Sequence, residues 1–147
     1  MIVVDTNILA YRCLPGPQTE LVERLVVLDP DWAAPLLWRS EFRNVLIGCI
    51  RAGRLTTVDA EVALRFARQS LRAGEHLVED EAVLALAARS RCTAYDCEYA
   101  ALASALGTVL VTEDKALRAA FPRLCRSLEQ MLAFRPNPPA EPTEPGL

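Results

Sequence analysis

The sequence predicts an α/β fold with a mostly parallel sheet, and two observations carry this prediction. Short runs of β-branched and apolar residues alternate along the chain with segments of helical periodicity, which is the pattern of strand–helix–strand units. The 147 residues suffice for one compact domain, and a mean hydropathy of +0.16 is too apolar for a disordered chain.

Three segments are expected to form strands. Residues 2–4 (Ile-Val-Val) are a short β-branched run that stops at Asp5, and residues 32–35 follow the breaker Asp29-Pro30-Asp31. Residues 108–112 (Thr-Val-Leu-Val-Thr) make the clearest strand in the chain. Short apolar runs of this kind are typical of buried strands.

Helices are predicted where apolar residues recur at helical spacing and where capping or breaking residues mark an end. Thr57 is expected to be an N-cap, and Ser127-Leu-Glu-Gln130 has the pattern of a capping box. The expected helices cover residues 6–14, 18–28, 37–51, 57–73, 79–90, 93–106, 113–120 and a last short segment after 127.

The composition along the chain predicts one domain and a tail. Residues 1–133 are expected to form the domain, and the Pro-rich residues 134–147 a disordered tail. The longest uncharged run, residues 99–112, has 14 residues, fewer than the roughly 20 that a membrane-spanning helix needs. The N-terminus lacks the basic and long apolar regions of a signal peptide. We therefore expect no membrane segment and a cytoplasmic location.

Cysteine and histidine usage excludes several kinds of site. The five cysteines are scattered without a CxxC pair, so a disulfide framework or a zinc knuckle is not expected, and the thiols are interpreted as small apolar side chains. The single histidine, His76, lies in a polar stretch without a nucleophile signature, which argues against a Ser-His-Asp or Cys-His site.

Four acidic residues lie where predicted elements meet. Asp5 and Asp114 follow predicted strands, and Asp96 and Glu41 lie in the first turns of predicted helices. Open α/β sheets bind ligands outside the carboxyl ends of their strands, so these carboxylates are expected to share one rim. A cation would offset their repulsion, and a set of oxygen ligands suits Mg²⁺ or Mn²⁺. Each Asp is also a natural helix cap, and Glu41 alone fits a solvated helix position.

The order and surroundings of these acids resemble a known family. The quoted segments are Val4-Asp5-Thr6-Asn7, Ser40-Glu41-Phe42-Arg43-Asn44-Val45-Leu46, Tyr95-Asp96-Cys97-Glu98-Tyr99 with Ala100-Ala101-Leu102-Ala103, and Leu110-Val111-Thr112-Glu113-Asp114. They resemble the four acidic motifs of PIN domains and, more narrowly, of VapC-type toxins of type II toxin–antitoxin systems. The similarity covers roughly residues 1–133, in order and at the family's usual spacing.

This resemblance implies a three-layer α/β/α sandwich around a four- or five-stranded parallel sheet. It also implies a homodimer, a cognate antitoxin protein and Mg²⁺- or Mn²⁺-dependent cleavage of RNA. Asp5, Glu41, Asp96 and Asp114 match the catalytic, metal-holding positions. Asn7 and Thr112 match supporting positions, and Thr6 is a further hydrogen-bond donor beside them; whether Glu98 or Glu113 joins the site is left open.

Basic residues near these motifs are candidates for phosphate contact. Fifteen of the sixteen basic residues are arginines, which either favours phosphate binding or reflects a GC-rich genome. The candidates are Arg12, Arg39, Arg43 and Lys115.

Two other readings are weighed against the nuclease. A non-catalytic PIN-like scaffold that binds RNA or a protein partner has no physical reason to keep four repelling carboxylates. Phosphoryl-transfer domains of the HAD or receiver type fit poorly. The HAD type needs a second Asp where Asn7 stands, and in a receiver the lysine follows the last strand, whereas Lys115 directly follows Asp114.

Overall fold

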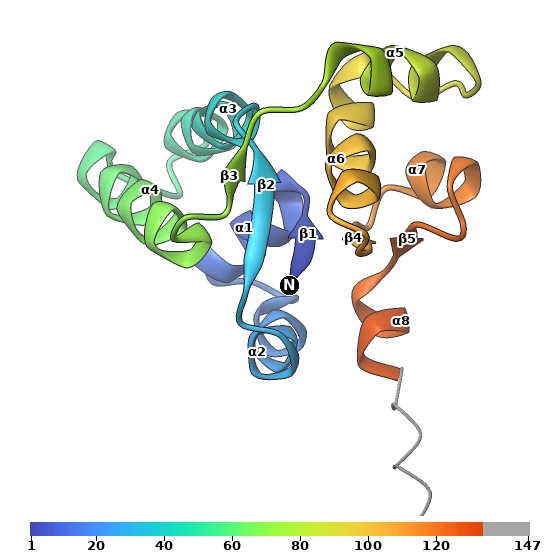
Figure 1. The fold of residues 1–147 in the computed structure, drawn as a ribbon. Coiled ribbons are helices and arrows are strands. Elements are labelled where there is room, and N and C mark those ends of the chain that lie inside the picture. Colours follow the sequence, from blue (N-terminus) through green and yellow to red (C-terminus); the bar gives the residue numbers. More distant parts are fainter. Residues whose placement is uncertain (134–147) are drawn as a thin grey trace, which may run out of the picture.

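The computed structural model describes residues 1–133, and the tail expected over residues 134–147 lies outside the described residues. Within residues 1–133, five parallel strands form one sheet and eight helices surround it (Figure 1). The strands are β1 (Ile2–Val4), β2 (Trp32–Pro35), β3 (Glu75–His76), β4 (Leu110–Val111) and β5 (Cys125–Arg126). The helices are α1 (Thr6–Cys13), α2 (Thr19–Leu28), α3 (Trp38–Arg51), α4 (Thr57–Leu71), α5 (Asp80–Ala88), α6 (Ala94–Ala105), α7 (Lys115–Ala120) and α8 (Leu128–Ala133).

The strand order β3-β2-β1-β4-β5 confirms the parallel sheet and places β1 at its centre. In β1, Ile2 lies opposite Trp32 of β2, and Val3 lies opposite Leu110 of β4. From β1 the chain first adds strands on one side and then returns to add β4 and β5 on the other. The order therefore reverses between β1 and β4, and that reversal is where open α/β sheets place their ligand crevice.

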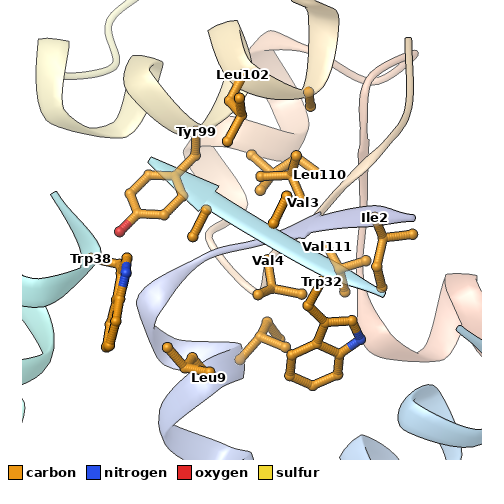
Figure 2. Packing of buried hydrophobic residues seen from close by; sticks show 14 of the residues in the cluster. Ile2, Val3, Val4, Leu9, Trp32, Trp38, Tyr99, Leu102, Leu110 and Val111 are labelled. Atoms are coloured by element: carbon orange, nitrogen blue, oxygen red, sulfur yellow. The ribbon is translucent and has the colours of Figure 1, made fainter. Parts of the chain in front are cut away.

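Helices cover both faces of the sheet, which confirms the three-layer sandwich. Helix α6 packs on β1, β2 and β4 with α5 against it, whereas α1 packs against α2, α3 and α4 (Figure 1). Val3 and Val4 are fully buried between these layers, together with Leu110 and Val111 of the neighbouring strand (Figure 2). Continuous burial of both faces explains why the central strands are uninterrupted apolar runs.

Two short strands, β3 and β5, have no counterpart among the segments predicted as strands. Each has two residues and contains a charged or polar side chain in place of an apolar run. The predicted strand 108–112 is also shorter in the structure, because only Leu110–Val111 form β4, but its apolar run made it recognisable. The chain enters β3 through Gly74, whose amide donates to the Leu71 carbonyl and whose carbonyl accepts from Ala34. A Cβ at Gly74 would lie 2.1 Å from the carbonyl oxygen of Trp32, so only glycine allows this approach of the two backbones.

The helices differ from the predicted ranges by at most two residues at an end: α7 begins at Lys115 and not at 113, α5 ends at Ala88 and not at 90, and α4 ends at Leu71 and not at 73. Ser127 and Gln130 form the predicted capping box before α8, since each backbone amide donates to the other's side chain. The N-cap of α4, however, is Thr56 and not Thr57: its hydroxyl accepts from the Asp59 amide, and Asp59 accepts from the Thr56 amide.

The cysteines are all free in the described part of the chain. None of the helices among residues 1–133 is long and apolar enough to cross a membrane.

Candidate functional site

A cavity of about 220 Å³ opens at the carboxyl ends of β1 and β4, at the point where the strand order reverses. All four predicted acidic residues border it, from four separate segments of the chain. The lining consists of Asp5, Thr6, Asn7, Glu41, Asn44, Val45, Asp96, Tyr99, Asp114 and Leu117.

Asp5 is the most buried of these acids, with 8% of its surface exposed. It follows β1 and caps α1, so its Oδ1 accepts from the Ile8 amide at 2.9 Å. Its Oδ2 accepts from the Thr112 hydroxyl at 2.5 Å. Burial raises the pKa of Asp5 to about 6, although these hydrogen bonds favour the ionised form and lower it. The charge of the nearby Glu41 carboxylate adds to the increase. Asp5 is therefore a carboxylate that benefits from a positive charge beside it.

Thr112 links two of the acids although it does not itself line the cavity. Its hydroxyl donates to Asp5 and accepts from the Asp114 amide at 3.0 Å. Asp114 in turn caps α7, because its Oδ1 accepts from the Leu117 amide at 2.8 Å. One fully buried hydroxyl thus couples the ends of β1 and β4, as expected for a supporting residue.

Asp96 enters the site as part of a capping box. It is the third residue of α6, and its Oδ2 accepts from the Thr93 hydroxyl at 2.7 Å and the Thr93 amide at 3.3 Å. Its own amide donates to the Thr93 hydroxyl. The capping role weighed for Asp96 in the sequence is therefore real, and it engages one carboxylate oxygen.

Glu41 lies in the first turn of α3 and is held by two hydroxyl groups. Its Oε2 accepts from Thr6 at 2.7 Å and from Tyr99 at 3.0 Å. Tyr99 was not among the predicted site residues, because an aromatic residue in an apolar helix indicates core. Its spacing from Asp96, three residues along α6, is the signal that places both on one helix face. Asn44, three residues after Glu41, was missed in the same way.

The two additional acids do not line the cavity. Glu113 turns away, and its Oε1 accepts from the Leu128 amide at 2.7 Å at the start of α8. Glu98 is half-buried, and burial together with the charges of Glu41 and Asp80 raises its pKa. Glu113 thus holds the first amide of α8, and Glu98 lies close enough to Glu41 for the charge of Glu41 to contribute to its raised pKa.

Comparison with protein families decides what this arrangement belongs to. The family model described as PIN domain matches residues 2–121. The chain belongs to the PIN-domain family. No curated protein sequence was found to match the chain.

Solved structures share the PIN fold of this chain. PAE2754 from Pyrobaculum aerophilum is 25% identical, with a TM-score of 0.71, over 89% of this chain and 92% of its own. FitAcB from Neisseria gonorrhoeae is 24% identical, with a TM-score of 0.64, over 88% and 99% of the two chains. FitAB bound to the IR36 DNA fragment is 18% identical, with a TM-score of 0.65, over 87% and 95%.

The basic residues predicted to contact phosphate fall into two groups in this PIN domain. Arg12 lies at the far end of α1 from Asp5 and stacks 4.8 Å from the Trp32 ring centroid, so the prediction is wrong for it. Arg39 donates from Nε and Nη2 to both carboxylate oxygens of Glu75. Arg43 and Lys115 are exposed, and Lys115 directly follows Asp114.

The donor set of the PIN cavity fits a hard divalent cation. Oxygen atoms supply every candidate ligand, as Mg²⁺ and Mn²⁺ prefer. Glu41, Asp96 and Asp114 each keep one carboxylate oxygen that accepts no hydrogen bond from any residue between 1 and 133. Among those same residues, no three acidic, His or Cys side chains are already close enough together to hold a metal ion. Binding an ion therefore requires some of these side chains to move.

Proposed function

We propose that this PIN domain is a metal-dependent endoribonuclease that hydrolyses RNA phosphodiester bonds and acts as the toxin of a toxin–antitoxin pair in the cytoplasm. The observation that carries the proposal is the meeting of Asp5, Glu41, Asp96 and Asp114 at one cavity where the strand order reverses. These residues come from four segments spread over more than a hundred positions, which a purely local capping role does not require.

Mg²⁺ or Mn²⁺ fits these four carboxylates, with Thr6, Asn7 and Thr112 in support. A bound divalent cation would supply Lewis-acid activation of water and of the scissile phosphate. The protein's own part is to hold the carboxylates in place before substrate arrives. Thr112 fixes Asp5 relative to the Asp114 backbone, and Asp114 is fixed in turn by the first turn of α7.

The rim supplies donors that an anionic substrate needs beside a ring of acids. Asn7 and Asn44 are exposed amides that line the cavity, and they can donate to phosphate or ribose oxygens without a charge. Lys115 adds positive charge directly after Asp114, whereas Arg43 is exposed on another side of α3 from Glu41 and lines a separate hollow beside α4. Single-stranded RNA is the proposed substrate, because its bases and backbone can splay into a small cavity.

The proposed partners are an antitoxin protein and a second copy of this chain. Helix α4 carries three exposed apolar side chains at four-residue spacing, Val58, Val62 and Phe66, with 68%, 52% and 41% of their surfaces exposed. A stripe at this spacing lies along one side of the helix and fits an amphipathic partner helix. We propose that the antitoxin binds this stripe and that two copies of the chain contact each other through a different surface of the domain.

The test is cleavage of a mixed RNA pool by purified protein with Mn²⁺, and with excess EDTA. The decisive variant is Asp96→Asn, with Asp59→Asn as its matched control. Both residues are the third residue of a helix and form the same capping box with a threonine, but only Asp96 lines the cavity. We expect EDTA and Asp96→Asn to abolish cleavage and Asp59→Asn to leave it intact.

Equal cleavage by wild type and Asp96→Asn would overturn the nuclease proposal. If no RNA is cut, calorimetric titration with Mn²⁺ decides between the two readings of the site. Binding that Asp96→Asn weakens, without any turnover, would replace the nuclease with a non-catalytic scaffold.

A further inference from the structure

Three oxygen atoms from three helices meet at the wall of the acidic cavity. They are the Thr6 hydroxyl of α1, the Tyr99 hydroxyl of α6 and Oε2 of Glu41 in α3. Thr6 lies 2.6 Å from Tyr99 and 2.7 Å from Glu41, and Tyr99 lies 3.0 Å from Glu41. Each pair is within hydrogen-bond distance, so the contacts form a closed triangle.

The proton count shows how this triangle holds Glu41. The two hydroxyl groups carry two protons for three contacts, because an ionised carboxylate only accepts. At any moment either both hydroxyls donate to Glu41, or one hydroxyl donates to Glu41 while the other hydroxyl donates to the first. Burial raises the pKa of Tyr99 above its ordinary value, so the phenol keeps its proton as a donor.

Within residues 1–133, Tyr99 makes no hydrogen bond through its hydroxyl outside this triangle. Its side chain is 2% exposed, and its ring lies among core side chains while the hydroxyl is directed away from α6, toward the side where Trp38 of α3 lies (Figure 2). A phenylalanine would satisfy the ring's packing equally well. Packing of the core therefore does not require the hydroxyl, and the charged group that the hydroxyl contacts is Glu41.

We propose that Tyr99 is a positioning residue that anchors Oε2 of Glu41 so that the other oxygen, Oε1, is presented to a divalent cation. The inference rests on the proposed metal site and deepens it. Without the Tyr99 hydroxyl, only the Thr6 hydroxyl would hold Oε2 of this flexible side chain. Fixing Glu41 in advance removes the entropy cost of ordering it when the ion binds.

The experiment compares Mn²⁺ affinity by calorimetric titration in wild type, Tyr99→Phe and Tyr95→Phe. Tyr95 lies on the same helix but is 66% exposed and does not line the cavity, so its variant is the matched control. Removing an outer hydrogen-bond partner of a metal ligand typically weakens binding about tenfold or more. We expect about a tenfold loss for Tyr99→Phe and none for Tyr95→Phe, with melting temperatures measured alongside in EDTA.

A double-mutant cycle separates positioning from a general structural effect. In a Glu41→Ala background, Tyr99→Phe should cause no further loss of Mn²⁺ affinity, whereas a structural role would cost the same in both backgrounds. Thr6→Val and Thr6→Ser form a second test: loss of the hydroxyl should weaken binding, and the serine should restore it.

Failure of this inference is distinguishable from failure of the proposed function. If wild type binds Mn²⁺ and Tyr99→Phe binds it equally well, the positioning role is wrong and the metal site stands. If wild type binds no Mn²⁺, both are wrong. A folded Tyr99→Phe whose loss persists unchanged in the Glu41→Ala background would also overturn the role proposed for Tyr99.

Discussion

Replacing Asp5 by Asn should stabilise the metal-free protein while destroying its response to metal. Asp5 is buried at the end of β1, and the side chain of Asn fits the same two contacts. Its carbonyl can accept from the Ile8 amide and its amide can donate to the Thr112 hydroxyl, but the buried Thr112 hydroxyl then has no acceptor for the proton that it donates to Asp5 in wild type. Asn is as good an N-cap as Asp, so α1 keeps its start.

The magnitude follows from the pKa of Asp5, which burial raises from 3.8 to about 6. The native state holds this proton to a higher pH than the unfolded chain does, so stability falls as pH rises from about 4 to about 6. Above pH 7 the full difference applies, about 3 kcal/mol at 1.36 kcal/mol per pH unit. The buried Thr112 hydroxyl, which loses its acceptor in the variant, removes about 1 kcal/mol of that gain. Asp5→Asn should therefore be about 2 kcal/mol more stable at pH 7.5.

The assay is urea and thermal unfolding of both proteins in EDTA at pH 4.5 and 7.5, and again with Mn²⁺. In EDTA the variant's advantage should be about 4–8 °C at pH 7.5 and should nearly vanish at pH 4.5. Saturating Mn²⁺ should stabilise wild type alone. At a Mn²⁺ concentration of a hundred times its Kd, the free energy of unfolding of wild type should rise by about 2.7 kcal/mol, and its melting temperature with it. A variant that is less stable than wild type in EDTA at pH 7.5, or an advantage independent of pH, would refute the reasoning.

Three further outcomes test the fold and the site. Asp96→Asn and Asp59→Asn should lower the melting temperature equally, because their capping boxes are the same, but only Asp96→Asn should lose Mn²⁺ binding in calorimetry. Gly74→Ala should cost at least about 2 kcal/mol in urea unfolding, because the new Cβ meets a carbonyl of β2 at 2.1 Å; an unchanged midpoint would contradict that contact. Arg72, at φ 50° and ψ −116°, ends α4 in a conformation that favours glycine, so Arg72→Gly should gain about 1 kcal/mol, whereas Arg65→Gly inside the same helix should lose about as much.

The central strands and the four acids could be predicted because their signals are local. β1 is an uninterrupted β-branched run that ends at Asp5, and parallel pairing brings the ends of neighbouring strands to one edge. Strands β3 and β5 could not be found in this way. They lack an apolar run and are set by pairing with partners far along the chain, as in the pairing of Pro35 with His76.

Side chains whose partners are distant in sequence were the other source of error. Arg12 stacks on Trp32 and on Phe66, which lies 5.6 Å away and more than fifty residues further on. The position of Arg12 close to Asp5 in sequence suggested a phosphate contact, but in the fold its guanidinium packs against these two aromatic rings. Tyr99 shows the reverse case, since an apolar helix position turned out to carry the hydroxyl that reaches Glu41.

Capping a helix and binding a metal ion, which the sequence offered as alternatives for Asp96 and Asp114, are compatible roles because a carboxylate has two oxygens. Asp96 and Asp114 cap α6 and α7 with one oxygen each, and their second oxygens accept no hydrogen bond from residues 1–133. A cap that holds one oxygen fixes the rotamer and so directs the other, because both are attached to the same planar group. Glu41, in the first turn of α3, makes no capping hydrogen bond there, and its Oε2 is held by Tyr99 and Thr6. The same principle thus accounts for all three residues, with helix amides or capping threonines as donors in two cases and side-chain hydroxyls from neighbouring helices in the third.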